Sequence, residues 1–263
     1  YGNELGTPGT IMTTFPYKGK GVPEGQKGAG QITATSFSVP GAALEFWRRR
    51  LAAHGIRISG EGTRFGEDFL TFNDPAGLVA ELIAGNRDQR APWTTDEIGP
   101  AAAIRGVSGI TMTIRAPKES LALLTDVLGF ETIAQSGNRT RLAVNDDAPG
   151  KTIDILHAPE APGARNGLGT VHHVALAVPD PEDQVRMRAE LLRLGYSVTQ
   201  VLDRQYFHSI YFREPGGVLF EIATVPPGFT VDENPADLGR GLKLPPWEEP
   251  QRAAIEAALP RLA

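Results

Sequence analysis

Hydrophobic and polar positions along the chain fall into three similar series, each of which starts with a run rich in β-branched and aromatic residues. The three runs are ITATSFSVP (32–40), GITMTIRAP (109–117) and VHHVALAVP (171–179). Residues of this kind favour strands, and the proline that closes each run breaks a strand ladder. The pattern therefore predicts three opening strands that end at equivalent prolines.

A helix with one apolar face is predicted after each opening strand. The apolar positions repeat at helical spacing, and a glycine follows each helix as the usual C-terminal stop. The predicted buried faces consist of Leu44, Trp47 and Leu51, then Leu121, Leu124 and Leu128, then Val185, Ala189 and Leu192, with stops at Gly55, Gly129 and Gly195.

Each series closes with a proline-containing turn, a glycine and an apolar run. The three closing segments are DPAGLVAELIA (74–84), DAPGKTIDILH (147–157) and EPGGVLFEIAT (214–224). An acid follows each glycine at the fourth position, at Glu81, Asp154 and Glu221. An even spacing on a strand puts the glycine and the acid on one face. Each series is therefore interpreted as a βαβββ unit.

A partial fourth copy is visible at TPGTIMTTF (7–15), where Gly9 aligns with Gly77 and Thr13 takes the position of the acid. The alternative is an ordinary turn before an edge strand. With a repeat period of roughly 70 residues, the opening of this unit would precede residue 1 by roughly 40 to 55 residues. The predicted organisation is a remnant of a first unit, three further units and a tail: 1–20, 29–86, 103–158, 169–225 and 226–263.

Composition narrows the possible partners and metal ligands. The 263 residues carry a formal charge of −5 without a basic block, and no apolar run has the length of a membrane span, which argues against nucleic acid and membrane as partners. The absence of cysteine excludes disulfides and thiolate ligands. A metal would therefore be held by His, Asp, Glu or Tyr, and the composition fits the predicted cytoplasmic location.

Only the last unit combines a histidine on its opening strand with an acid on its closing strand. His172 and His173 are adjacent, so on a strand one of them should face the cavity together with Glu221. A divalent metal bound by histidine and carboxylate needs a third protein ligand and open positions for substrate. No third cavity-facing histidine is evident in the chain, and the expected source is the opening strand of the first unit.

The repeats, with HHVALAV and GGVLFEIA, resemble the vicinal oxygen chelate superfamily of glyoxalases, bleomycin-resistance proteins and extradiol dioxygenases. Residues 203–233, DRQYFHSIYFREPGGVLFEIATVPPGFTVDE, with the tail LGRGLKLPPWEE, are more specifically similar to ring-cleaving dioxygenases of the hydroquinone type. The resemblance implies an α+β fold of tandem βαβββ units in two pseudo-barrels. In that family the first and fourth units enclose the metal, and the second and third pair without it.

The same resemblance implies Fe(II) as the metal, with Mn(II) or another divalent ion left open, and an aromatic ring and O2 as co-substrates. It assigns His173 and Glu221 as ligands and His172 as a residue near the substrate hydroxyl. Arg204 and Tyr211 match positions near the substrate, although a surface ion pair and a core aromatic remain alternatives. His208 is a weaker candidate, because a residue three positions from Tyr211 faces the other way unless a bulge intervenes.

Two other functions remain open on the same scaffold. One is a glyoxalase-like isomerase or lyase, which would use Zn or Ni and need no O2. The other is a metal-free protein that binds an aromatic ligand, of the bleomycin-resistance kind. The sequence also leaves open a catechol-type ring, a homo-oligomer, and the role of the tail, where Ile255, Leu259 and Leu262 predict a short amphipathic helix.

Overall fold

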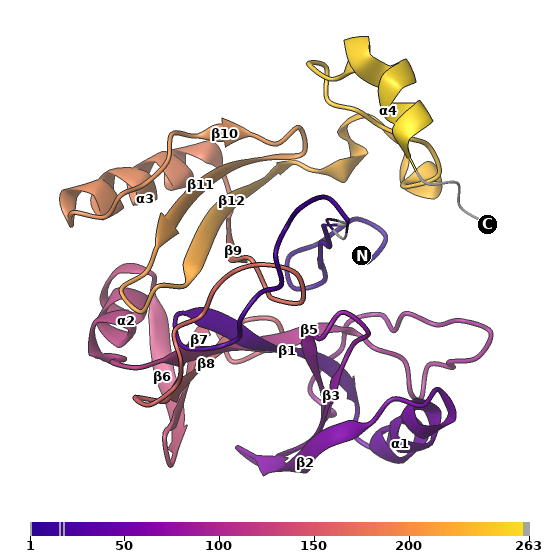
Figure 1. Cartoon of the computed structure of the whole chain (residues 1–263), viewed down its shortest axis with the longest axis vertical. Coiled ribbons are helices and arrows are strands. Elements are labelled where there is room, and N and C mark those ends of the chain that lie inside the picture. Colours follow the sequence, from indigo (N-terminus) through magenta and orange to yellow (C-terminus); the bar gives the residue numbers. More distant parts are fainter. Residues whose placement is uncertain (1, 16, 18, 260–263) are drawn as a thin grey trace.

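The computed structural model describes residues 2–15, 17 and 19–259 and contains two separate β-sheets (Figure 1). An eight-stranded sheet has the order β2-β3-β4-β1-β5-β8-β7-β6, and a four-stranded sheet has the order β10-β11-β12-β9. Among the helices of the described residues, none combines the length and hydropathy needed to cross a membrane.

The eight-stranded sheet is built from two βαβββ units. The first comprises β1 (Gln31–Pro40), α1 (Leu44–Ala53), β2 (Ile58–Arg64), β3 (Glu67–Asn73) and β4 (Val79–Gly85). The second comprises β5 (Gly106–Ile114), α2 (Lys118–Ala122), a π-helical turn (Leu123–Val127), β6 (Phe130–Ser136), β7 (Arg139–Val144) and β8 (Thr152–His157). The opening strands β1 and β5 pair antiparallel and join the two units into one sheet.

The four-stranded sheet is a third βαβββ unit. It comprises β9 (Val174–Val178), α3 (Pro181–Arg193), β10 (Leu202–Asp203), β11 (Phe207–Arg213) and β12 (Leu219–Pro227). After it come short 3-10 turns (Phe229–Val231, Pro235–Asp237 and Glu249–Gln251) and α4 (Arg252–Ala258). In each of the three units the opening strand runs parallel to the closing strand, β1 to β4, β5 to β8 and β9 to β12.

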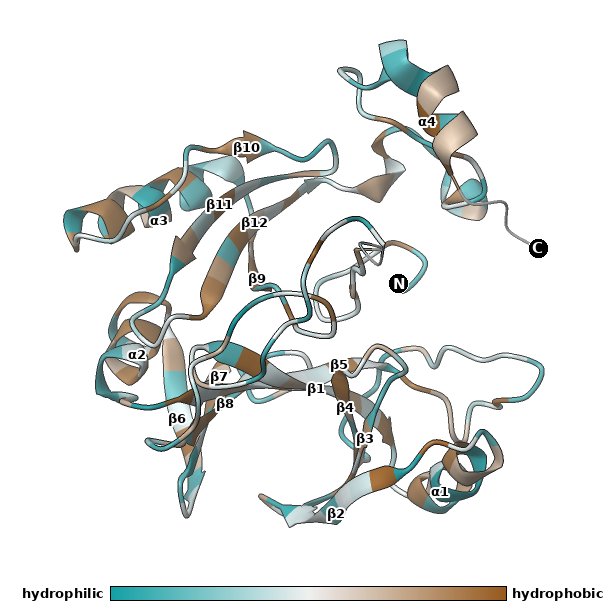
Figure 2. Cartoon of the chain, viewed as in Figure 1, coloured by the Kyte–Doolittle hydropathy of each residue, from teal (hydrophilic) through white to brown (hydrophobic). Residues whose placement is uncertain are grey.

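The helices α1 and α3 each bury one face, and both carry brown and teal residues (Figure 2). In α1 the buried residues are the predicted Leu44, Trp47 and Leu51, and the Trp47 indole N–H donates to the Ala102 carbonyl at 2.8 Å. A second apolar cluster connects the unit of β5 to the unit of β9. It includes Met112, Ile114, Leu124, Leu191, Ile210, Phe212 and Phe220.

The predicted face of α3 is wrong. Val185 and Leu192 are 56% and 42% exposed, whereas Gln184 and Leu191 are buried. A polar side chain decides which face is buried, because the Gln184 amide donates to the carbonyls of His208 and Ile222, both at 2.7 Å. These two bonds turn the Gln184 side of the helix toward β11 and β12.

The strand expected over 7–15 is also wrong: residues 7–10 form a turn and residues 11–15 have no regular structure. The glycine of this segment nevertheless behaves like its counterparts in the repeat. Gly9 has φ +81°, against +91° at Gly77, +91° at Gly150 and +100° at Gly217. Its carbonyl accepts hydrogen bonds from the Val107 amide and the Arg90 guanidinium, both at 2.8 Å, which ties the segment to β5.

Two linkers run side by side, one leading into β1 and the other leading from β8 to β9. Residues 23–29 form backbone hydrogen bonds of 2.8–3.0 Å with residues 162–168. Glycines permit this close approach, because a Cβ added at Gly28 would lie 2.1 Å from the Pro162 oxygen and one at Gly167 would lie 2.4 Å from the Pro23 oxygen. The N-terminal segment lies in the space between the two sheets (Figure 1).

Candidate active site

The candidate site is centred on the carboxylate of Glu221, which lies on β12 and is 3% exposed. Tyr211 lies opposite it on β11, and Ser209 is two residues away on the same face of that strand. The Tyr211 hydroxyl donates to Glu221 Oε1 at 2.8 Å, and the Ser209 hydroxyl donates to the same oxygen. His173 Nε2 lies 2.7 Å from the other oxygen, Oε2. Three side chains from two segments thus converge on one buried carboxylate.

The adjacent histidines lie immediately before β9 and not within it, because the ladder with β12 begins only at the Val174–Phe220 pair. The alternation of faces along a strand therefore does not separate them. Their rings are in contact, with Nδ1 of His172 and Nδ1 of His173 2.8 Å apart. Of the two, His173 is the one that contacts Glu221, so the structure brings together the pair expected from the sequence.

Glu221 is held in its charged form by its neighbours. Burial on its own would raise the pKa of Glu221, but hydrogen bonds from His173, Ser209 and Tyr211 hold that pKa below the ordinary glutamate value. Burial and the nearby Glu221 carboxylate raise the pKa of the Tyr211 phenol. The site therefore combines a buried negative charge with a phenol that remains a hydrogen-bond donor at neutral pH.

The imidazole of His172, unlike the Glu221 carboxylate, is favoured in its neutral form. Burial, the adjacent His173 and the positive charge of Arg213 lower the pKa of His172. A neutral imidazole at pH 7 has one ring nitrogen free to accept a proton. His172 is thus suited to take a proton from a ligand that binds beside His173.

Arg204 and His208 take different places relative to this group. The Arg204 guanidinium lies 5.6 Å from the centre of the Tyr211 ring, so Arg204 is close to the site. A register shift between Phe207 and Ser209 places a β-bulge at His208, and a bulge is the condition under which His208 could face the same side as Tyr211. Nδ1 of His208 is buried without a hydrogen-bond partner, and no hydrogen bond or ion pair in the described residues joins its side chain to Glu221. His208 therefore stays outside the converging set.

The side chains of His173 and Glu221 are of the kinds that bind a divalent metal, but they amount to two ligands where such a site has three. Imidazole and carboxylate are the donors of a two-histidine, one-carboxylate site, and His173 and Glu221 point at one another. Within residues 2–15, 17 and 19–259, no group of three or more His, Asp or Glu side chains is arranged to hold a metal ion. The structure thus brings two of the expected ligand side chains into contact with each other.

The equivalent acids of the other two units bind arginine instead. Glu81 receives two hydrogen bonds from Arg64, at 3.1 and 2.6 Å. Asp154 receives hydrogen bonds from Arg139 and Arg141, at 3.2 and 2.7 Å. Sequence reasoning missed these arginines, although the alternation of Arg139 and Arg141 along β7, on one face of the strand, is a detectable signal. In those units guanidinium groups already neutralise the acids.

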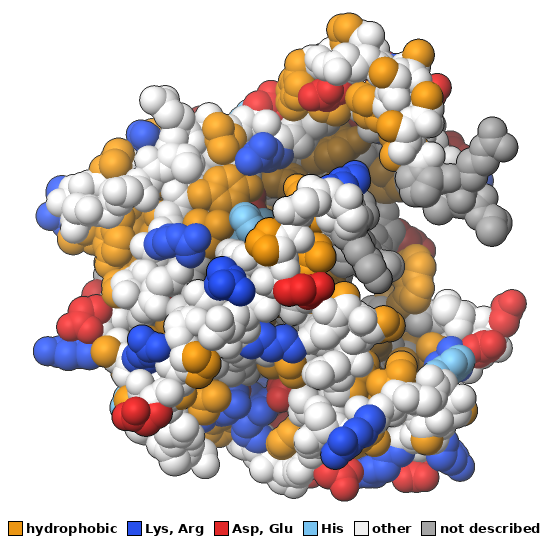
Figure 3. All heavy atoms as spheres, in the orientation of Figure 1, with side chains coloured by type: hydrophobic (Ala, Val, Ile, Leu, Met, Phe, Trp, Pro, Cys, Tyr) orange, Lys and Arg blue, Asp and Glu red, His pale blue; other side chains and the backbone are white. Residues whose placement is uncertain are grey.

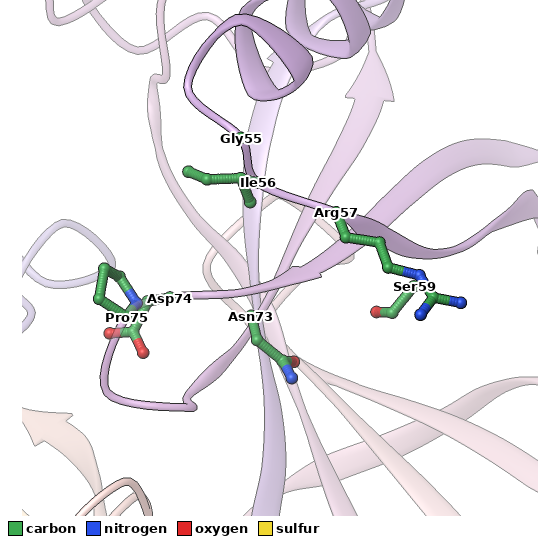
Figure 4. A pocket seen from close by; sticks show the side chains of 7 residues that line it. All are labelled: Gly55, Ile56, Arg57, Ser59, Asn73, Asp74 and Pro75. Carbon is green, nitrogen blue, oxygen red and sulfur yellow. The ribbon is translucent and has the colours of Figure 1, made fainter.

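A surface cavity of about 600 Å³ lies elsewhere, between the end of α1 and the turn that joins β3 to β4 (Figure 4). Its lining includes Arg57, Asn73 and Asp74, all in the first unit of the eight-stranded sheet. It shares no lining residue with the group around Glu221, so it plays no part in the candidate site.

Comparison with known proteins identifies the family. Residues 106–222 match the family described as Glyoxalase/Bleomycin resistance protein/Dioxygenase superfamily. A Bacillus subtilis protein named as a ring-cleaving dioxygenase, MhqO, is 40% identical over 98% of this chain and 81% of its own length. The chain belongs to this superfamily. The chlorohydroquinone/hydroquinone 1,2-dioxygenase of Sphingobium indicum is 37% identical over 95% of this chain and 78% of its own length.

Solved structures of this superfamily confirm the predicted fold class of tandem βαβββ units. A crystal structure of a dioxygenase from Bacillus subtilis subsp. subtilis str. 168 matches with a TM-score of 0.92 and 40% identity, over 100% of this chain and 83% of that chain. Glyoxalase I from Zea mays matches with a TM-score of 0.53 at 14% identity, over 75% of this chain and 68% of that chain, which shows the fold alone. Superfamily membership and the dioxygenase relatives imply a divalent metal.

Proposed function

We propose that the protein is an Fe(II)-dependent ring-cleaving dioxygenase that inserts both atoms of O2 into an aromatic ring of the hydroquinone or catechol type. The observation that carries the proposal is the approach of His173 Nε2 to Glu221 Oε2, 2.7 Å apart. It occurs in a chain 37% identical to a chlorohydroquinone/hydroquinone 1,2-dioxygenase. The residue types, their positions in the repeat and the named activity of the relative thus support the same proposed function.

In this proposal His173 and Glu221 hold the metal. Glu221 suits the role because its charge is buried and, among the described residues, no Lys or Arg forms an ion pair with it. Fe(II) bound there supplies the redox capacity that reaction with O2 requires and acidifies a ring hydroxyl. The chain itself supplies orientation and proton transfer.

The surrounding side chains act on the ring hydroxyl. His172, whose pKa is lowered, accepts the proton that the hydroxyl releases. Tyr211 stays protonated, and when the ring is bound its one hydroxyl hydrogen turns from Glu221 Oε1 to the ring oxygen on which negative charge develops. The Arg204 cation, beside the Tyr211 ring, stabilises the resulting anion.

The test is to load the protein with Fe(II) under anaerobic conditions and to follow O2 uptake with hydroquinone, chlorohydroquinone and catechol. We expect one O2 consumed per ring. His173→Ala should weaken iron binding by more than about tenfold, since even an outer hydrogen-bond partner of a ligand contributes that much. His54→Ala is the matched control, because His54 is an exposed residue at the C-terminal end of α1.

Each part of the proposal can fail separately. Stoichiometric iron in His173→Ala would refute the ligand assignment. An iron-loaded protein that consumes no O2 with any ring would refute the dioxygenase activity. Isomerisation of a hemithioacetal by the Zn- or Ni-loaded protein, without O2, would support the glyoxalase-like alternative.

A further inference from the structure

Phe15 lies beside His172 at the edge of the candidate site, and its side chain is exposed. Its ring is in edge contact with the His172 ring, with centroids 6.2 Å apart and planes at 66°. His172 contacts His173 at 5.1 Å, and His173 contacts Tyr211 at 5.7 Å, both edge to face. Phe15 thus belongs to a continuous series of aromatic contacts that ends on Tyr211, a hydrogen-bond donor to Glu221.

The segment that carries Phe15 is anchored at two places. Six residues earlier, the Gly9 carbonyl accepts from Arg90 and from the Val107 amide. Arg90 is itself fixed by the buried Asp88, with hydrogen bonds of 2.7 to 3.2 Å. At Gly6 the backbone packs so closely on the Phe229 ring that a Cβ would lie 2.6 Å from it. These contacts fix the path of the chain that leads to the site.

The Phe15 ring has a second aromatic neighbour besides His172. Tyr17 stacks on Phe15, with ring centroids 5.6 Å apart and an angle of 7° between the planes. Phe15 is still 49% exposed, so part of its apolar surface is uncovered beside a polar cluster. At the centre of the face in Figure 3, a histidine side chain lies next to hydrophobic side chains.

We propose that Phe15 forms one wall of the substrate site and determines which ring substituents are accepted. The inference rests on the proposed function. A planar ring whose hydroxyl is held near His172 and Tyr211 would contact the exposed part of the Phe15 ring. Aromatic pairs prefer offset-stacked or edge-to-face contacts, which a phenyl side chain provides without competing for the hydroxyl. A substituent on the ring would meet Phe15 and alter this contact.

The test compares Phe15→Ala and Phe15→Leu with Trp93→Ala, an exposed aromatic residue in the loop between β4 and β5. For Phe15→Ala we expect KM for hydroquinone to rise about two- to tenfold, the effect of one aromatic pair, with kcat within about twofold and iron content unchanged. Phe15→Leu retains bulk but not the aromatic face, and should fall between Phe15→Ala and the native protein. The ratio of kcat/KM for chlorohydroquinone and hydroquinone should change in Phe15→Ala and stay constant in Trp93→Ala.

Equilibrium binding of 4-nitrophenol, followed by absorbance, separates this inference from the dioxygenase activity. If the native protein binds 4-nitrophenol but cleaves no ring, the proposed function fails, and a two- to tenfold weaker Kd in Phe15→Ala still supports the wall. A folded Phe15→Ala protein with unchanged KM, Kd and substituent preference would overturn the inference. The absence of any phenol binding by the native protein would overturn it as well.

Discussion

Glu221 and Glu81 occupy the same position of the repeat, yet their neighbours give the two carboxylates different chemistry. Glu81 is paired with the Arg64 guanidinium, which neutralises its charge. Glu221 receives its hydrogen bonds from the imidazole of His173 and from two hydroxyl groups. A buried carboxylate without a guanidinium partner is suited to a metal cation, because a buried charge requires a compensating one.

Tyr211→Phe tests the role of the phenol. The variant removes the one phenolic hydrogen, which donates to Glu221 Oε1 in this structure and is proposed to donate to the ring oxygen when a ring is bound. We therefore expect kcat to fall by on the order of 10²-fold while iron content is retained. Tyr196→Phe is the control, since Tyr196 packs on Phe212 and makes no contact with the Glu221 group among the described residues. Equal turnover in Tyr211→Phe and in the native protein would remove Tyr211 from the mechanism.

At the residue scale the repeat predicted that one of His172 and His173 would lie beside Glu221, and the family resemblance selected His173. The sequence did not predict that His172 touches His173, since that contact depends on where β9 begins. Ser209 was missed for a related reason. A serine on a strand carries no signal until the register places it beside a buried carboxylate.

At the scale of elements, the closing strands of the last unit are fixed to α3 by one polar side chain. Gln184 is 1% exposed and its amide bridges a carbonyl on β11 and a carbonyl on β12. These are the strands that carry Tyr211 and Glu221. The position of the site therefore depends on a buried hydrogen-bond donor on the opposite side of the sheet.

Gln184→Leu keeps the size of the side chain but leaves two buried carbonyl groups unpaired. We expect the free energy of unfolding to fall by about 1–3 kcal/mol, the usual cost of an unsatisfied buried polar group. Urea denaturation monitored by circular dichroism measures this loss. Gln135→Leu, at an exposed position of β6, should change the stability by no more than about 0.5 kcal/mol. A similar small effect at position 184 would contradict the bridging role.

The ends of the helices could be predicted because their signals are local. Gly55, Gly129 and Gly195 follow the three helices with φ of +67°, +73° and +89°, a conformation that favours glycine. The sequence predicted a strand over 7–15 that does not form, because an apolar run becomes a strand only when another strand pairs with it. The face of α3 was wrong for the same kind of reason: Gln184 finds its partners far away in the sequence.

At the scale of the molecule, charged side chains form a partly buried network between the two units of the eight-stranded sheet. Arg64 bonds to Glu81 of its own unit and lies 3.7 Å from Asp154 of the next. Arg141 bonds to Asp154 and reaches back to Glu67 at 2.6 Å. The fold class was predictable from the repeats, but this network was not, because each pair of partners between units is brought together only by the β1–β5 junction.

Glu81→Gln should destabilise the protein in a pH-dependent way. Burial alone would raise the pKa of Glu81, but Arg64 and Ser36 hold that pKa below the ordinary value of 4.5. Its contribution is therefore fully present above about pH 4.5 and is lost as the pH falls through the lower pKa of the folded state. We expect a loss of about 3–5 kcal/mol at pH 7, from a buried pair with one partner removed.

Urea denaturation of native protein and Glu81→Gln from pH 7 to pH 3 measures this difference, which should shrink toward the acid end. Glu45→Gln is the control, because Glu45 forms exposed contacts of 3.6 and 4.0 Å with Arg48 and Arg49 and should change stability little at any pH. A difference that stays constant with pH would show that the charge of Glu81 does not contribute.

The close contact between residues 23–29 and residues 162–168 limits which substitutions the protein tolerates. At Gly28 and Gly167, main chain touches main chain, and neither position has room for another carbon. No rotamer change can absorb a methyl group there, so an alanine would push the two linkers apart. A mutagenesis survey restricted to the residues around Glu221 would overlook these two glycines, although the linker of Gly28 follows Phe15 in the chain and the linker of Gly167 precedes His172.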